Sequence, residues 1–206
     1  LRENKVMSLK TRFGNLGNIL DFNNLTEENI YVLNSPILTN NQFEKFVSFF
    51  DKNNKTIDCT FNSDENIESK LNSIKQEAEI YVRQGVTQII LSDKNVSKEN
   101  YPVPMLLCIG AVHTHLTKMK LRGYVSINVQ TGEALDTHSF ATLIGVGATT
   151  VNPYLALDSL YQRFEKELFG KFLYEECVER YVKSVNLGLL KILSLIHISE
   201  PTRHRQ

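Results

Sequence analysis

The sequence is poor in cysteine, carries no net charge and has no long apolar run, and each absence excludes a class of protein. Three cysteines among 206 residues make a poor disulfide framework, so we expect a reducing compartment. Lysine plus arginine and aspartate plus glutamate both total 23, a balance that gives no basis for binding nucleic acid or an anionic membrane. The longest apolar stretch, around Val103 to Val112, is broken by His113 and falls short of the roughly 20 residues of a membrane span.

The start of the chain has no basic and then apolar segment of the signal-peptide kind, so we expect a cytoplasmic location. Apolar residues make up 42% of the sequence, enough to build the core of one domain, or of one domain and part of a neighbour. Cys59, Cys108 and Cys177 lie tens of residues apart, whereas an iron–sulfur cluster needs closely grouped thiolates unless the fold brings them together. We interpret all three as buried thiols.

From Thr56 onward, two kinds of segment follow one another along the chain. In one kind, apolar and polar residues alternate, as in strands; in the other, apolar residues recur every three or four positions, as in helices. We expect strands at 56–61, 86–91, 124–129 and 148–151. We expect helices at 42–50 (capped by Thr39 or Asn40), 67–82, 102–120, 136–144, 154–168 and 174–193. The first twenty residues predict an ordered but irregular loop. Short connections between strands and helices favour parallel pairing with right-handed crossovers in an α/β fold.

Polar residues follow the predicted strands. Asp93, Glu133 and Asn152 come just beyond the strand ends, where parallel α/β folds place ligands, so any independent chemistry would gather there. The loop Gly145–Ala148 has the glycines of a phosphate-binding loop, but it follows a helix and precedes a strand, whereas a dinucleotide fingerprint lies between a strand and its helix. We favour a helix stop over a phosphate site for these glycines.

Three histidines, His113, His115 and His138, offer a weaker hypothesis of a metal site. Residues two apart on a helix point about 200° away from each other, so His113 and His115 cannot hold one ion there. On a strand they would share a face, and Glu133 or Asp136 would complete the ligands. We favour the helix, and we expect His138 to bond a strand-end carbonyl or carboxylate.

Five stretches of the sequence carry a resemblance to a known family. They read MSLKTRFGNLGNIL (7–20), SPILTN (35–40), IGAVHTHL (109–116), ALDTHSFATLIGVGATTVNPYLA (134–156) and GLLKILS (188–194). On these stretches the chain resembles the large subunit of glutamate synthase, in the later part of its central domain. The resemblance runs from Leu1 to about Ser194.

The resemblance implies an activity and a division of labour. Glutamate synthases move the amide nitrogen of glutamine onto 2-oxoglutarate and reduce the imine, which gives two glutamates. The family divides this work among an amidotransferase domain with a cysteine nucleophile, a central domain, an FMN-binding barrel with an iron–sulfur cluster, and a β-helix. The chain starts at Leu1 rather than at such a cysteine, so we expect no glutaminase activity. We also expect no FMN or cluster bound by this part alone, and no catalysis by it in isolation.

The resemblance also implies partners and a fold. The partners are the amidotransferase and FMN domains of the same full-length chain, with a small subunit or ferredoxin for the parent enzyme; nucleic acid and membranes are not expected. The electron donor, whether NADPH, NADH or ferredoxin, stays open. The implied fold is a partial TIM-barrel-like domain of parallel βα repeats, and an open doubly wound sheet is the alternative.

Two groups of site residues follow from the resemblance. Met7, Lys10 and Arg12 would lie near the substrate or the flavin. A core methionine explains Met7 equally well, and we favour a solvated basic surface for Lys10 and Arg12. The other group would line the passage that carries ammonia between the glutaminase and the imine-forming site, and its members are Ser35, Pro36 and Thr39. A capped loop without a functional role is the alternative for this second group.

The predicted domain organisation has three parts. Residues 1–170 would belong to the central domain and residues 171–194 would form the first helix of the FMN domain. Residues 195–206 depart from the family pattern and have no apolar periodicity, so we interpret them as a foreign tail. Two further hypotheses are a free-standing α/β enzyme that binds flavin or a sugar phosphate at its strand ends, and a metal-dependent hydrolase built on the three histidines.

Overall fold

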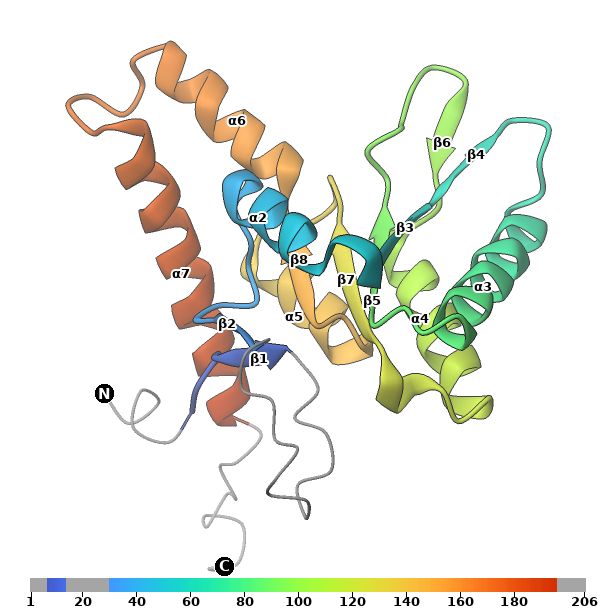
Figure 1. Cartoon of the computed structure of the whole chain (residues 1–206). Helices are drawn as coiled ribbons and strands as arrows, with labels where there is room; N and C mark the ends of the chain where they lie inside the picture. The colour runs from blue at the N-terminus through green and yellow to red at the C-terminus, as the bar shows by residue number, and fades with distance from the viewer. Residues whose placement is uncertain (1–6, 14–29, 196–206) are drawn as a thin grey trace, which may run out of the picture. The chain divides into compact units, whose positions relative to one another are not determined.

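The computed structural model describes residues 7–13 and 30–195 (Figure 1). The predicted tail lies outside the described residues from position 196 onward. The chain divides into two compact units. The smaller unit consists of Leu1–Pro36 with Leu190–Gln206, and the larger unit is Ile37–Leu189.

The smaller unit contains a short antiparallel pair of strands, β1 (Thr11–Phe13) and β2 (Tyr31–Leu33). Phe13 and Leu33 are buried, whereas Arg12 is exposed, as expected where a ribbon has one covered face. The predicted irregular loop was therefore wrong at 11–13. Three residues are too few for an alternating pattern to be recognised in the sequence.

The larger unit is built on a parallel sheet in the order β3–β5–β7–β8. Its strands are β3 (Asn54–Asp58), β5 (Gln88–Ser92), β7 (Ser126–Gln130) and β8 (Thr150–Asn152). Beyond β8, Ile37 forms a parallel bridge with Val151, so the first extended segment of the unit pairs with its last strand. In a barrel the first strand lies beside the last, as Ile37 lies beside β8 here, whereas a doubly wound sheet keeps its first strand in the interior. The α/β class and the partial barrel are therefore confirmed.

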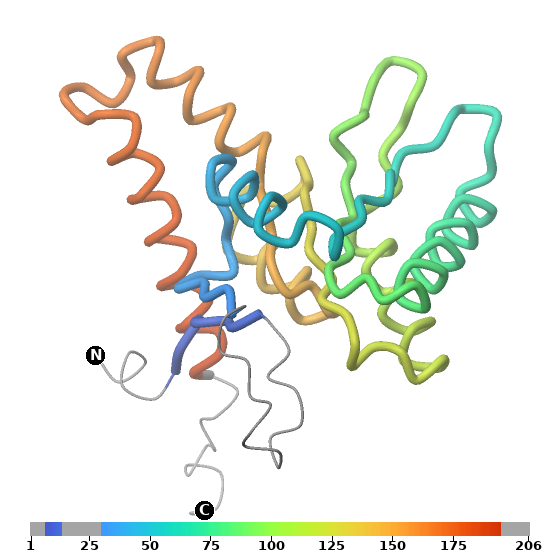
Figure 2. Tube along the Cα trace, viewed as in Figure 1, coloured from blue at the N-terminus to red at the C-terminus, as the bar shows by residue number. Residues whose placement is uncertain are grey.

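The helices begin and end close to the predicted positions, and Figure 2 traces their alternation with the strands. They are α2 (Asn40–Phe50), α3 (Ile67–Arg83), α4 (Met105–Lys118), α5 (Thr137–Val146), α6 (Tyr154–Glu165) and α7 (Tyr174–Leu195), with 3₁₀ turns η2 (Asp51–Asn53) and η3 (Arg122–Tyr124). Gly147 ends α5 with φ 133°, which confirms a glycine stop in this loop, but the helix continues through Gly145, two residues beyond its predicted end at 144. Within the described ranges, no helix is both long enough and apolar enough to cross a bilayer.

Two predicted boundaries were wrong at the carboxyl end of β3. The strand expected at 56–61 breaks at Cys59, and β4 (Thr60–Asn62) leaves the sheet to pair antiparallel with β6 (Asn100–Pro102). The apolar alternation continues through Cys59 without an interruption that would predict the break. Pro102 ends β6 instead of opening a helix, and α4 begins three residues later at Met105.

The two faces of the parallel sheet differ in chemistry because successive side chains of a strand point to opposite faces. The apolar face is fully buried and consists of Ile57, Ile89, Leu91, Ile127, Val129 and Val151. The other face carries polar residues in neighbouring strands, namely Gln88, Ser92, Asn128, Gln130, Thr150 and Asn152. Helices α3, α4 and α5 pack against one another in chain order, which places them on one side of the sheet. The polar face corresponds to the inside of the partial barrel.

Candidate functional site

At the carboxyl ends of the parallel strands, side chains form a row of hydrogen bonds that crosses the sheet. The Ser92 hydroxyl donates to Oε1 of Gln130 at 2.8 Å, and Nε2 of Gln130 donates to Oδ1 of Asn152 at 3.3 Å. Nδ2 of Asn152 donates to the carbonyl oxygen of Leu38 at 2.9 Å and to Oδ1 of Asn40 at 3.0 Å. The row therefore joins three strands to the beginning of α2.

Asp93, the residue after β5, is 2% exposed, and its carboxylate is held by three partners. The Thr131 hydroxyl donates to Oδ2 at 2.5 Å, and the N–H of Gly132 donates to both oxygens at 3.1 and 3.2 Å. The Tyr154 hydroxyl is the third partner, and burial together with the charge and hydrogen bond of Asp93 raises the pKa of this tyrosine. The protein's own donors thus use the lone pairs of Asp93.

Glu133 follows the same edge of the sheet, but its carboxylate bonds to the beginning of α4. Its carboxylate accepts from the N–H of Met105 at 3.1 and 3.3 Å, so a negative charge lies at the N-terminus of α4, which has no side-chain cap from the preceding Pro104. Partial burial raises the pKa of Glu133, the N–H of Met105 lowers it, and the charge of Asp93 raises it again, with a net increase. Glu133 therefore acts as a helix cap.

A second polar row crosses the same face of the sheet nearer its amino end. The Thr150 hydroxyl donates to Oδ1 of Asn128 at 2.7 Å, and Nδ2 of Asn128 donates to Oε1 of Gln88 at 3.0 Å. These three side chains are at most 4% exposed. A buried polar group without a partner costs about 1–3 kcal/mol, so the row favours this strand register over any shifted one.

The polar side chains at the strand ends, Asp93 and Asn152 among them, form their hydrogen bonds with other groups of the protein. Among the described residues, no buried side-chain nitrogen or oxygen lacks a hydrogen-bond partner. A ligand site needs polar groups that point into open space, and Asp93 and Asn152 point into the protein. The sequence correctly placed these residues at the strand ends, but their contacts are those of structural supports.

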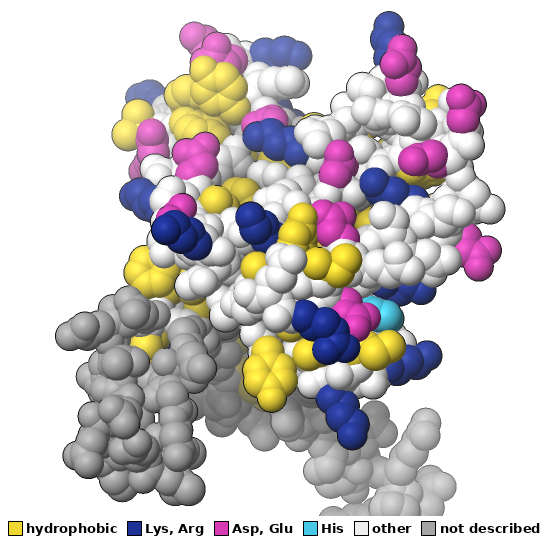
Figure 3. Space-filling model, turned by 45° about the vertical axis from the view of Figure 1, so that its right-hand side comes forward, with side chains coloured by type: hydrophobic (Ala, Val, Ile, Leu, Met, Phe, Trp, Pro, Cys, Tyr) yellow, Lys and Arg dark blue, Asp and Glu magenta, His cyan; other side chains and the backbone are white. Residues whose placement is uncertain are grey.

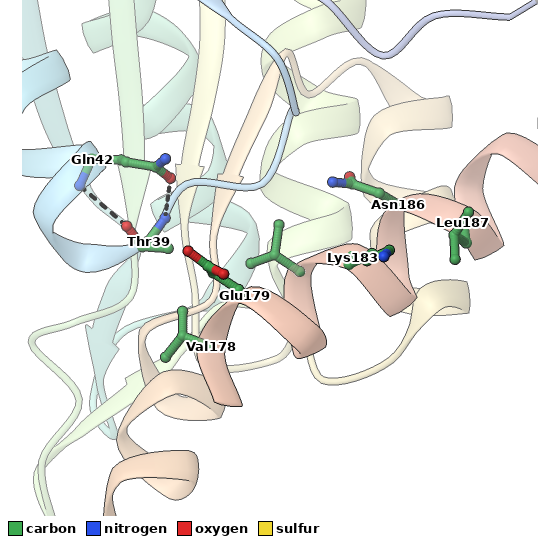
Figure 4. Close-up of a pocket in the computed structure, with 8 residues that line it drawn as sticks. Thr39, Gln42, Val178, Glu179, Lys183, Asn186 and Leu187 are labelled. Carbon is green, nitrogen blue, oxygen red and sulfur yellow. Dashed lines mark hydrogen bonds between the residues drawn. The ribbon is translucent and has the colours of Figure 1, made fainter. Parts of the chain in front are cut away.

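A groove of about 290 Å³ lies between the first turn of α2 and α7 (Figure 4). Its lining is Thr39 and Gln42 from the start of α2, and Val178, Glu179, Val182, Lys183, Asn186 and Leu187 from α7. The α7 residues recur at steps of three and four, so they lie on one side of that helix.

Thr39 and Gln42 form a capping box at the α2 end of the groove. The N–H of Gln42 donates to Oγ1 of Thr39 at 3.3 Å, and the N–H of Thr39 donates to Oε1 of Gln42 at 3.0 Å, as the dashed lines in Figure 4 show. The predicted cap of α2 is confirmed. The groove thus has a fixed rim at this end, and the role of Thr39 in an ammonia passage stays a prediction.

The other residues assigned from the resemblance belong to the smaller unit. Met7 is half-buried, and Lys10 and Arg12 are exposed. Ser35 is half-buried and Pro36 is buried. Their roles near a flavin or along a passage also stay predictions.

The histidines of α4 have separate partners. Nδ1 of His113 accepts from Nε of Arg122 at 3.1 Å, and Nε2 of His115 lies 2.6 Å from Oε2 of Glu79. Both residues lie on a helix, as predicted. Each ring has a partner from a different segment of the chain, Arg122 for His113 and Glu79 for His115. In the part of the chain that the structure describes, no three His, Cys, Asp or Glu side chains come together as metal ligands would.

The cysteines are free and buried, as interpreted from the sequence. The fold brings two of them together: contact with the Cys108 thiol, followed by burial, raises the pKa of Cys59 well above its usual range. Cluster ligands are thiolates, and an iron–sulfur cluster takes four of them. Two adjacent protonated thiols in the core do not fit such a cluster.

Sequence reasoning missed the polar part of the groove. It recognised an apolar stripe on the last helix, which includes Val178 and Val182, but it did not single out Glu179, Lys183 or Asn186. Their spacing of four and three was an available signal. The position of α2 opposite this stripe had no signal in the sequence.

Comparison with known proteins places the chain among its relatives. The family model described as glutamate synthase central domain matches residues 1–203. The glutamate synthase [NADPH] large chains of Azospirillum brasilense and Bacillus subtilis (strain 168) are 45% and 37% identical to it, and the matches cover 100% of this chain but only 14% and 13% of those proteins. The chloroplastic ferredoxin-dependent glutamate synthase of Spinacia oleracea is 36% identical over 97% of this chain and 13% of its own length.

Among solved structures, a putative fructose-1,6-biphosphate aldolase from Coccidioides immitis aligns with a TM-score of 0.34 and 13% identity. The alignment covers 74% of this chain and 60% of the aldolase. A likeness of this size does not bear on function.

Proposed function

The chain belongs to the glutamate synthase central domain family, and we propose that it is an architectural part of a longer, cytoplasmic glutamate synthase. The longer protein would transfer the amide nitrogen of glutamine to 2-oxoglutarate, with FMN and an iron–sulfur cluster held by its other domains. This part would hold the amidotransferase and FMN domains in register and help to wall the ammonia passage between them. It would not catalyse alone.

The internally satisfied strand ends support the architectural role. In a catalytic α/β domain the carboxyl edge of the sheet offers polar groups to a substrate. Here the Asp93 carboxylate binds Thr131 and Gly132, and Glu133 caps α4. This use of the strand ends for internal bonding is the observation that carries the proposal.

The groove between α2 and α7 supports the passage role. Val178 and Val182 form the apolar part of its wall, Glu179, Lys183 and Asn186 form the polar part, and the capping box engages polar atoms of Thr39 and Gln42. Its volume of about 290 Å³ exceeds the roughly 30 Å³ that one water occupies in the liquid, so a molecule as small as ammonia fits. The assignment of Ser35 and Pro36, which belong to the smaller unit, to an ammonia passage is proposed from the resemblance alone.

The resemblance extends the proposal to residues and partners outside the groove. We assign Met7, Lys10 and Arg12 to the neighbourhood of the substrate or the flavin. The boundary between the central domain and the FMN domain would fall near residue 170, and residues 195–206 would be a foreign tail. A small subunit or ferredoxin would supply electrons to the complete enzyme.

The passage can be tested by filling the groove in the full-length enzyme with Val182→Phe. We expect ammonia to escape, because a larger side chain on the wall narrows the route. The measurement is the ratio of glutamine hydrolysed to 2-oxoglutarate consumed, which we expect to rise by about tenfold, as when a positioned intermediate is lost to solvent.

The matched control is Val96→Phe, at an exposed position (47%) in the loop before β6. Its ratio should equal that of the parent enzyme. A folded Val182→Phe enzyme that keeps the parent ratio would show that this groove is not the passage.

A further inference from the structure

The turn between α6 and α7 exposes large apolar side chains. Leu168 is 67% exposed, Leu173 64%, Tyr161 49% and Phe172 43%. Hydrophobic side chains gather at the upper left of Figure 3, where this turn lies. Single exposed apolar residues are ordinary, but a group of them marks an interaction surface.

The tip of this helical hairpin is held in a fixed shape. The Tyr174 ring packs against Tyr161 at 5.4 Å and Phe164 at 5.9 Å between centroids, and the Arg180 guanidinium lies 4.1 Å from the centroid of Phe172. The apolar side chains are therefore presented on an ordered support, which lowers the entropy lost on binding.

A hollow of about 490 Å³ opens at the same tip. Its lining is Phe164, Phe169, Gly170, Phe172 and Leu173, with Glu165, Glu167 and Lys171 at its charged positions. Glu167 and Gly170 both have left-handed backbones, with φ of 55° and 64°, so the turn bends around this space. The aromatic and leucine side chains of this hollow suit an inserted apolar side chain, which is the usual centre of a protein interface, and its charged side chains suit polar contacts around it.

We propose that the α6–α7 tip is a docking surface for another domain of the same polypeptide, which inserts an apolar side chain into the hollow. This inference rests on the proposed architectural role, and it identifies one surface through which the chain would contact its neighbouring domain. The matched relatives are about seven times longer than this chain, since it covers 14% of the first of them, so the occupant is covalently tethered and present at high effective concentration. The charged residues that line the hollow have both signs, which favours neither a nucleic acid nor an anionic membrane.

The test is site-specific photo-crosslinking in the full-length chain, with a benzophenone amino acid replacing Leu168 or, in a second variant, Leu173. We expect an intrachain crosslink from either position to a segment outside residues 1–206, identified by mass spectrometry. A crosslink to a second copy, a crosslink to a different protein, or reaction with solvent alone would each overturn the proposal.

A second measurement needs no variant. Hydroxyl-radical oxidation of the unmodified full-length chain should be about fivefold slower at Leu168 and Leu173 than at Ile80 after correction for intrinsic reactivity, because interface cores exclude water. Ile80 on α3 is 53% exposed and serves as the control. Equal oxidation would also overturn the proposal. Neither readout depends on ammonia transfer, so the docking surface and the passage can fail independently.

Discussion

Two regions of the larger unit differ in which side chains they bury. The carboxyl edge of the parallel sheet buries polar side chains, whereas the outer surface of α7 exposes apolar ones. At the sheet edge, Asp93 and Asn152 are buried and fully bonded within the protein. Along α7 and its turn, the groove and the hairpin tip leave Val182, Leu187 and Leu173 partly or largely exposed. At the edge where α/β folds usually bind ligands, the polar groups bond within the protein, and the recognition surfaces that we propose lie on the helices.

The strongest test of this comparison removes the carboxylate at the centre of the sheet edge. We expect Asp93→Ala to lower the free energy of unfolding by about 3 kcal/mol, because the Thr131 hydroxyl and the Gly132 N–H lose their buried acceptor. Urea unfolding followed by circular dichroism measures the change. Asp64→Ala, at an exposed position, should change it by less than about 0.5 kcal/mol. Equal midpoints for the two variants would contradict a supporting role for Asp93.

The contact between α7 and α5 can be broken at one glycine and compared with another. A Cβ at Gly188 would lie 2.5 Å from Cγ2 and 2.7 Å from Oγ1 of Thr137, so Gly188→Ala must move the helices apart, at a cost of about 2 kcal/mol. A Cβ at Gly145 in α5 meets nothing within 4 Å. We therefore expect Gly145→Ala to stabilise the chain by about 0.5–1 kcal/mol. Thermal unfolding should show shifts of opposite sign, and an unchanged or raised midpoint for Gly188→Ala would rule out close packing at Gly188.

The smallest effect concerns Asp58, at the more exposed end of the sheet edge. Burial raises its pKa, but hydrogen bonds from Asn95 and Thr60 lower it more, so the pKa lies below the ordinary value of 3.8. A lowered pKa in the folded state means that Asp58 stabilises the fold above pH 3.8 and that this contribution is lost as the pH falls through the folded pKa.

Asp58→Asn should therefore unfold with a shallower dependence on pH in this acid range. Urea midpoints between pH 5 and pH 2, with Asp64→Asn as the control, would measure the slope. An unchanged slope would assign the acid loss to other carboxyl groups.

The regular elements were predictable because their signals are local. Apolar spacing identified α3, Thr39 identified the start of α2, and Gly147 identified the end of α5. The pairing of β4 with β6 was not predictable. Each strand has three residues, and α3 and β5 separate them in the sequence, so neither strand carries a pattern that identifies the other as its partner.

The candidate site was only partly predictable for the same reason. Polar residues after strands indicated that Asp93 and Asn152 would lie at one edge of the sheet. Whether a carboxylate there is open or satisfied depends on partners such as Thr131 and Tyr154, which lie far away in sequence. The groove required knowledge of which helix packs beside α2.

The bridge between Ile37 and Val151 makes the folding of this part depend on translation. The Leu38 carbonyl and its Asn152 partner are 114 residues apart, so at about 5–20 residues per second the early edge waits roughly 6 to 23 s on the ribosome for its neighbour. During that interval an unfinished strand edge is open to foreign chains.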